Sequence, residues 1–141
     1  MKTNFELVKE FHAAFNKTPD PQFPSKQKED TKVLRIKLIT EEYKEVLNEL
    51  GYSLSHDPDP SNYPKGLELD KLAKELADLL YVVYGTAAAF GLPIDEVYRE
   101  VHESNMSKLG EDGKPVYRED GKVLKGPNYR PADVKKLIKE V

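Results

Sequence analysis

The sequence predicts an all-α fold: a four-helix-bundle-like domain that ends in a short β-hairpin and a terminal helix. In four segments the apolar residues recur every three or four positions, a spacing that gathers them on one face of a helix. Breaks that contain proline or glycine separate these segments. Because 141 residues is the size of one ordinary domain, we expect a single domain over residues 1–141.

Composition and charge exclude several classes of partner. The net charge of −3 argues against nucleic acid, whose binding needs a concentrated basic face. The chain has no cysteine, which excludes disulfides and thiolate metal sites and fits a reducing compartment. No apolar signal-peptide core follows Met1, and the most apolar stretch, residues 76–92, contains Asp78 and is too short to span a bilayer. We expect a cytoplasmic protein with no nucleic-acid or membrane partner.

The first helix is expected from a capping box, in which Glu6 follows Thr3 by three residues. It should end near Asn16, because the segment 18–24 contains three prolines. Its apolar face consists of Phe5, Val8, Phe11 and Phe15. His12, on the same helix, is interpreted as a structural or surface residue.

The second helix is predicted from about Glu29 to Leu50, with Gly51 as its stop signal. The proline-rich stretch 56–64 is predicted as a loop. A third helix should run from near Leu67 to about Phe90. It is apolar around so much of its circumference that we expect it to be buried on several sides, within its own bundle or against another subunit.

The fourth helix is predicted from Ile94 to about Lys108, after a break at Gly91 and Pro93. Two short apolar runs follow, on either side of Glu119-Asp-Gly. They predict a β-hairpin that turns at residues 120–121. The residues from Pro131 onward predict a short terminal helix.

Two pairs of carboxylates stand out on consecutive helices. Glu42 and Glu45 share a face of the second helix, and Glu75 and Asp78 share a face of the third. Each like charge raises the cost of ionising its neighbour, so two carboxylates side by side in a buried context need compensation. Mg²⁺ supplies it, because this ion takes oxygen ligands and leaves positions for water and phosphates.

A plainer interpretation stays open at this stage. Glutamate-rich helix faces are usually solvated, and that is the more frequent situation for the second-helix cluster taken alone. Lys71 and Lys74 could also pair with Glu75 and Asp78 on an exposed edge. Two such pairs on two successive helices are more specific than either pair alone.

The chain resembles the all-α nucleoside triphosphate pyrophosphohydrolases, which include the MazG-type, phosphoribosyl-ATP pyrophosphohydrolase and dimeric dUTPase branches. These proteins carry an E-x-x-E and an E-x-x-D motif on consecutive helices, here Glu42-Tyr-Lys-Glu45 and Glu75-Leu-Ala-Asp78. Glu41 supplies the frequent double glutamate. The resemblance extends from the second helix to Lys108, and the tail is similar to a MazG-like, phosphoribosyl-ATP-pyrophosphohydrolase-like branch.

This resemblance implies an enzyme that converts a (d)NTP and water to a (d)NMP and pyrophosphate, in a role that cleans the nucleotide pool. It implies Mg²⁺, or alternatively Mn²⁺, held by Glu42, Glu45, Glu75 and Asp78. Water would attack between the α- and β-phosphates. Glu41 would orient or deprotonate that water, or serve as a further metal ligand.

The resemblance also suggests contacts to the sugar and phosphates from Asn105, Lys108, Lys125 and Tyr129, although a helix end and a surface loop explain the same residues. Tyr81 either stacks on a base or belongs to the core. A homodimer or homotetramer is implied. The alternatives are a phosphoribosyl-ATP pyrophosphohydrolase of histidine biosynthesis, whose domains are commonly shorter and lack such a tail, and a non-catalytic helical dimerisation module.

Overall fold

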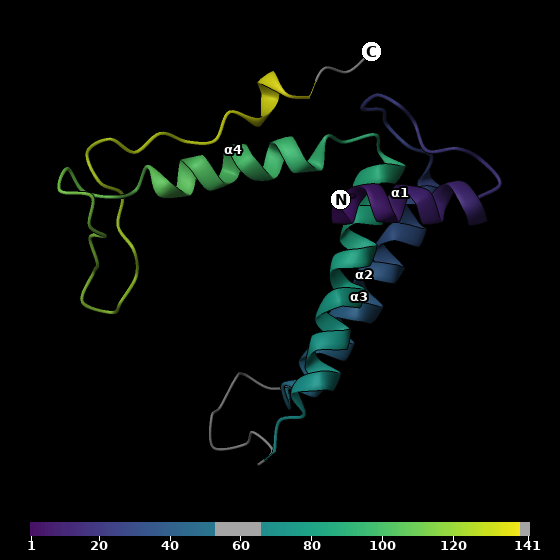
Figure 1. Ribbon diagram of the computed structural model, residues 1–141, viewed down its shortest axis with the longest axis horizontal. Coiled ribbons are helices and arrows are strands. Elements are labelled where there is room, and N and C mark those ends of the chain that lie inside the picture. The colour runs from purple at the N-terminus through teal and green to yellow at the C-terminus, as the bar shows by residue number, and fades with distance from the viewer. Residues whose placement is uncertain (53–65, 139–141) are drawn as a thin grey trace. The chain divides into compact units, whose positions relative to one another are not determined.

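The computed structural model describes residues 1–52 and 66–138, and four α-helices and one short 3₁₀ helix occur in this part of the chain (Figure 1). Their bounds are α1 Asn4–Phe15, α2 Glu29–Glu49, α3 Leu69–Ala89, α4 Ile94–Met106 and η2 Val134–Lys136. The predicted all-α class and its four main helices are confirmed. The loop predicted at 56–64 lies outside the described residues.

The chain forms two compact units, Met1–Gly91 and Leu92–Val141, and each is described by itself. Within the described residues, no single helix has both the length and the apolar character needed to cross a membrane. The helices α3 and α4 meet that criterion only when they are counted together.

In the first unit, α2 and α3 lie side by side along their length and α1 packs across α3 (Figure 1). The predicted capping box is present: the Glu6 amide donates to Thr3 Oγ1 (3.2 Å), and the Thr3 amide donates to a Glu6 carboxylate oxygen (2.7 Å). Phe5 and Val8 of α1 are buried, as are the alanines at the end of α3, residues 87–89. The small core of this unit therefore includes residues from both helices.

The helices α2 and α3 are antiparallel, and their register is fixed by a series of facing residues. Each step of seven, three or four residues toward the end of α2 is matched by an equal step toward the start of α3. The facing pairs are Arg35 and Gly85, Glu42 and Asp78, Glu45 and Glu75, and Glu49 and Lys71. A single seam thus runs along the pair and contains all four predicted metal ligands.

The segment between α1 and α2 is attached to the end of α3. The Ser25 amide donates a hydrogen bond to the Phe90 carbonyl (3.1 Å). Gly91 follows with φ +64°, and a Cβ atom there would lie 2.3 Å from the Phe23 carbonyl oxygen. Only glycine allows both this left-handed conformation and this close approach of the two backbones.

In the second unit, a buried carboxylate holds the C-terminal segment against α4. Glu100 is 6% exposed and accepts hydrogen bonds from Arg130 Nη1 (2.6 Å), Lys136 Nζ (2.7 Å) and the Asp133 amide (2.9 Å). The hydrogen bonds from Lys136, from the Asp133 backbone and from Arg130 lower the pKa of Glu100 to about 2. Ser104, also buried, donates to the Arg130 carbonyl (2.9 Å).

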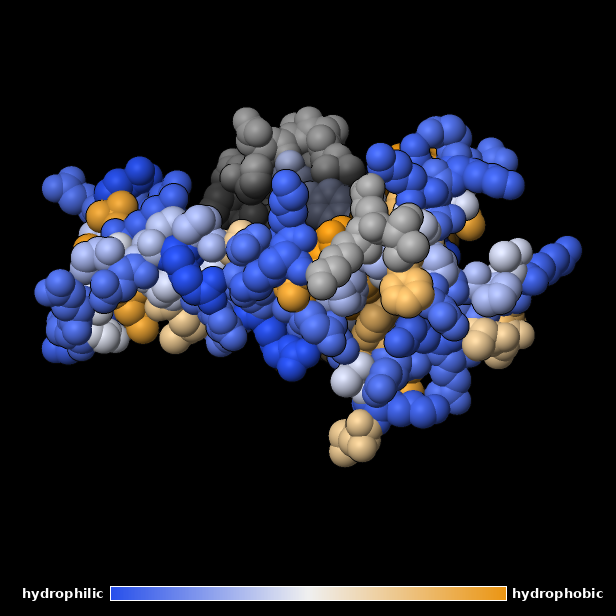
Figure 2. All heavy atoms as spheres, turned by 90° about the horizontal axis from the view of Figure 1, so that it is seen from above, coloured by the Kyte–Doolittle hydropathy of each residue, from blue (hydrophilic) through white to orange (hydrophobic). Residues whose placement is uncertain are grey.

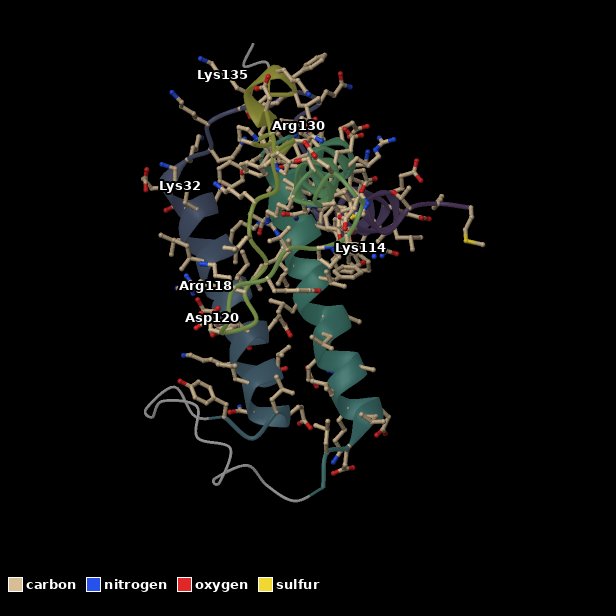
Figure 3. The ribbon with its side chains drawn as sticks, turned by 90° about the vertical axis from the view of Figure 1, so that its left-hand side faces the viewer. Lys32, Lys114, Arg118, Asp120, Arg130 and Lys135 are labelled. Carbon is tan, nitrogen blue, oxygen red and sulfur yellow. The ribbon has the colours of Figure 1, made fainter. Side chains whose placement is uncertain are left out.

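The predicted β-hairpin is wrong, because the described residues contain one isolated antiparallel bridge, between Tyr117 and Val123, and no strand. The chain does turn where expected: Gly121 has φ +82°, and Arg118 pairs with Asp120 (Figure 3). A two-stranded ribbon without a further strand or a packed helix is marginal in water. Within residues 131–138, the predicted terminal helix is reduced to one 3₁₀ turn, η2.

Many large apolar side chains are exposed, and Figure 2 shows hydrophobic atoms reaching a largely hydrophilic surface. On α3 they recur at helical spacing. The members of this stripe, which we call the open face of α3, are Leu69, Leu76, Leu80 and Val83. The expected burial of α3 on several sides is therefore incomplete within one chain.

Candidate metal centre

Three carboxylates meet at the seam between α2 and α3. Glu42 of α2 and Glu75 and Asp78 of α3 each offer one oxygen, and these oxygens lie within 4.8 Å of one another. The spacing of three residues puts Glu75 and Asp78 on one face of α3, and the antiparallel register sets Glu42 opposite them. All three residues are half-buried. This cluster could hold a divalent cation, because carboxylate oxygens are the ligands that hard cations prefer.

Glu45, the fourth predicted ligand, lies against Glu75 and outside the group of three. A hydrogen bond with the Glu75 carboxyl raises the pKa of Glu45, and partial burial and the negative charges of Glu42 and Glu75 raise it further. A hydrogen bond between two carboxyl groups requires a proton on one of them.

The pKa of Glu42 is also raised. Burial is the main cause, followed by the negative charges of Asp78, Glu41 and Glu75. Glu41 itself is exposed and is not one of the three clustered ligands. Its role as base or as further ligand stays a prediction.

Lys74 is the cation that the chain itself places at this cluster. Its ammonium donates to Asp78 Oδ2 (2.7 Å) and to both Glu75 oxygens (3.0 and 3.2 Å), and these hydrogen bonds raise the pKa of Lys74. The pairing suggested by the plainer interpretation is therefore present for this lysine. Lys71 pairs elsewhere, with Glu68 (2.7 Å). A cation that enters the cluster must replace the contacts of Lys74.

The predicted substrate contacts all lie in the second unit and form two neighbouring pairs. Lys108 Nζ donates to Asn105 Oδ1 (2.7 Å), and the ammonium of Lys125 lies 4.4 Å from the centre of the Tyr129 ring. The Gly126 amide donates to the Lys108 carbonyl (2.9 Å), which brings the two pairs together. Their contact with a substrate stays a prediction.

For Tyr81 the sequence allowed two roles, stacking on a base or packing in the core. Its side chain is 40% exposed. Its ring contacts Phe11 of α1 in an edge-to-face arrangement, with ring centres 5.6 Å apart. It lies on α3 one turn after Asp78. A fully buried core position is thereby excluded in the single chain.

The chain matches the phosphoribosyl-ATP pyrophosphohydrolase family over residues 8–105. An uncharacterized protein of Acanthamoeba polyphaga mimivirus is 26% identical over 145 residues, which cover 99% of this chain and 49% of that protein. The chain thus spans about half the length of this curated relative. A crystal structure of a candidate NTP pyrophosphohydrolase from Exiguobacterium sp. 255-15 is 26% identical, with 95% of this chain and 91% of that chain covered and a TM-score of 0.45.

Proposed function

Because the chain belongs to the phosphoribosyl-ATP pyrophosphohydrolase family, we propose that it hydrolyses a nucleoside triphosphate to a monophosphate and pyrophosphate. The observation that carries this proposal is the cluster of Glu42, Glu75 and Asp78, which lies within the matched residues 8–105. A cluster of three carboxylates is costly to a fold that makes no use of it, because like charges at short range repel.

The donor set fits Mg²⁺, with Mn²⁺ as an alternative. Glu42, Glu75 and Asp78 would hold the ion, and Glu45, whose carboxyl lies against that of Glu75, is proposed as the fourth ligand. When bound, the ion neutralises the phosphates and polarises the phosphoryl group under attack. The other steps of the reaction are proposed for side chains of the protein.

Glu41 is the residue proposed to hold and deprotonate the attacking water. Glu41 is exposed and precedes Glu42 directly in the sequence. Its negative charge is one of the causes, after burial and the charge of Asp78, that raise the pKa of Glu42. A base needs this combination of access and closeness to the reacting centre. In-line attack at the α-phosphorus would place the incoming oxygen in the monophosphate.

We also propose that the chain acts as a homodimer or homotetramer. The open face of α3 supports this, since it is an apolar stripe of four large side chains on one helix. Contiguous apolar surface of this kind is unusual on a monomer and typical of a protein interface. A second copy would bring an identical stripe, as twofold symmetry requires.

A second candidate substrate is phosphoribosyl-ATP, which the family description itself favours. Against it, the match ends at residue 105, and the chain continues with a further segment that wraps back onto α4 through Arg130 and Glu100. Both candidates undergo the same bond cleavage, so the carboxylate cluster does not distinguish them.

A panel of NTPs, dNTPs and phosphoribosyl-ATP with Mg²⁺, read by pyrophosphate release, tests the proposal. We expect pyrophosphate and the matching monophosphate in equal amounts, and no turnover when EDTA is added. Release of orthophosphate in place of pyrophosphate would contradict the proposed cleavage. The absence of any product with every substrate would favour the non-catalytic helical module.

A further inference from the structure

A second cluster of polar side chains lies in the first unit, apart from the metal centre. His12 of α1, Asp20 of the following segment and Arg35 of α2 meet at Gly85 of α3. His12 is 6% exposed, and its Nδ1 lies 2.6 Å from Asp20 Oδ2. Because a carboxylate only accepts, the His12 nitrogen donates this hydrogen bond, and Nε2 is the ring nitrogen left for another partner.

Arg35 has an unmet hydrogen-bonding need in this cluster. Its Nε is buried and has no hydrogen-bond partner within the part of the chain that the structure describes. Burial lowers the pKa of Arg35, and the charge of Asp20 opposes this only in part. A buried donor without an acceptor is costly, so a ligand that supplies an acceptor to this nitrogen would gain binding free energy.

Gly85 provides the space that the cluster occupies. A Cβ atom at this position would lie 3.1 Å from Arg35 Nη1 and 3.2 Å from His12 Nε2. Both groups therefore point to the same spot on α3. Arg35 offers hydrogen-bond donors and His12 offers a second polar atom, and the edge of a nucleobase carries polar groups that can pair with both.

Exposed aromatic rings lie next to this polar cluster. The Phe11 ring stacks on Phe15 with centres 4.5 Å apart and meets Tyr81 edge to face. Phe11 is 44% exposed and Phe15 is 73% exposed. The ring centres of Phe11 and His12 lie 6.5 Å apart, so the flat apolar surface and the polar cluster are neighbours. Rings of this kind stack on nucleobases irrespective of their identity.

The distance from the metal centre fits the length of a nucleotide. Arg35 precedes Glu42 by two turns of α2, and Gly85 follows Asp78 by two turns of α3, so the two clusters are separated by roughly 10 Å along the seam. Tyr81 lies between them on α3. With the reacting phosphates at the carboxylates, the nucleoside end of the same molecule reaches the second cluster.

We propose that His12, Arg35, Phe11 and Tyr81 form the recognition site for the base of the nucleotide substrate. The base stacks on the Phe11 ring, the Tyr81 ring, which is perpendicular to Phe11, borders the edge of the base, and an acceptor on that edge accepts a hydrogen bond from Arg35. Asp20 is a positioning residue, since it orients the His12 ring. This inference rests on the proposed function and adds to it the residues that select the substrate.

Binding measurements separate this role from phosphate binding. The probes are an α,β-methylene nucleoside triphosphate, which carries a base, and inorganic pyrophosphate, which does not, each titrated with Mg²⁺ by calorimetry. Arg35→Gln is compared with Lys32→Gln, which removes the same charge from the first turn of α2 (Figure 3), where Lys32 pairs with Glu29. We expect Arg35→Gln to weaken the nucleotide by about tenfold or more, as for a lost charged hydrogen bond. Pyrophosphate binding should stay within about twofold, and Lys32→Gln should change neither.

Equal weakening of both probes would overturn the inference, because Arg35 would then act on the phosphates. Unchanged nucleotide binding would overturn it as well. Phe11→Leu is the second variant, for use if Arg35→Gln fails to fold: it keeps an apolar side chain and removes the ring, and should show the same selective loss. If the unaltered protein binds neither probe and releases no pyrophosphate, the proposed function itself fails. If it turns over nucleotides while the variants bind them normally, only the base site fails.

Discussion

Replacing Glu42 by glutamine should make the metal-free protein more stable while it removes the response to Mg²⁺. The substitution keeps the shape of the side chain and deletes one of three charges that lie within 4.8 Å of one another. At 4.8 Å two unit charges repel by about 3.5 kcal/mol at an effective dielectric constant of ~20 and by about 0.9 kcal/mol in water. Because the site is half-buried and Lys74 offsets part of the repulsion, we expect a gain of about 1 kcal/mol, or a few degrees in Tm.

Thermal unfolding followed by circular dichroism, in EDTA and then in Mg²⁺ at matched ionic strength, measures both effects. Mg²⁺ should raise the Tm of the parent protein, and a non-hydrolysable triphosphate should raise it further. Glu42→Gln should lose both shifts together with turnover. The matched control is Glu49→Gln, the same chemical change on the same helix. Glu49 faces Lys71, whose pKa it raises, so its replacement should lower the Tm slightly.

The pH dependence of the unfolding free energy tests whether the charge of Glu42 destabilises the metal-free protein. Folding raises the pKa of Glu42, so the folded state binds this proton more tightly than the unfolded state. The stability of the metal-free parent therefore rises as the pH falls through the raised pKa, and the advantage of Glu42→Gln disappears there. A metal-free Glu42→Gln protein that is less stable than its parent at neutral pH would refute the reasoning.

Three further outcomes are expected. Lys74→Gln should tighten Mg²⁺ binding in calorimetry, because the ion no longer displaces an ammonium from Glu75 and Asp78, whereas Lys71→Gln should not. Hydrolysis in ¹⁸O-labelled water should label the monophosphate alone in mass spectrometry, and Glu41→Gln should lower kcat by about 10²–10⁴-fold with little change in substrate affinity. Label in pyrophosphate would place the attack at the β-phosphorus, and an unchanged kcat would remove Glu41 from its role. Protection of the segment 107–138 against hydrogen exchange, expressed relative to the intrinsic exchange rate at each pH, should fall in acid. Folding lowers the pKa of Glu100 to about 2, so the stabilisation from Glu100 is complete above its ordinary value of 4.5 and is lost as the pH falls from there through about 2. Glu100→Gln should show the reduced protection already at neutral pH.

The sequence predicted the helices well because each one carries its own signals. The capping box at Thr3 and the stop at Gly91 depend on residues close in the chain, and the structure contains both. The prediction of a hairpin was wrong because a stable strand depends on further strands or helices from other parts of the chain. The turn at Gly121 formed as expected, but the described residues give Tyr117 and Val123 no further strand to pair with.

The cluster of Glu42, Glu75 and Asp78 was predictable for the same reason as the helices, because a spacing of three residues puts carboxylates on one face and two successive helices lie antiparallel. The polar cluster was not predicted, and His12 was interpreted as structural or surface. Asp20 lies in a proline-rich segment whose path no periodicity gives. The register between α2 and α3 is the signal that could have identified this cluster. Once Glu42 is set opposite Asp78, moving two turns along each helix brings Arg35 opposite Gly85, where the absence of a side chain leaves room for the polar groups of Arg35 and His12.

The seam between α2 and α3 also constrains how this protein can change in evolution. The facing pairs fix the spacing between the carboxylate cluster and the polar cluster, because this spacing equals a whole number of helical turns. Insertion of one residue between Arg35 and Glu42 would rotate the Arg35 side chain relative to the Glu42 side chain by about 100° around the axis of α2. The helical stretch between these two positions should therefore tolerate substitution far better than any change in length, and descendants of this chain should diversify their substrates at residues beside the seam while the count of residues along it stays the same.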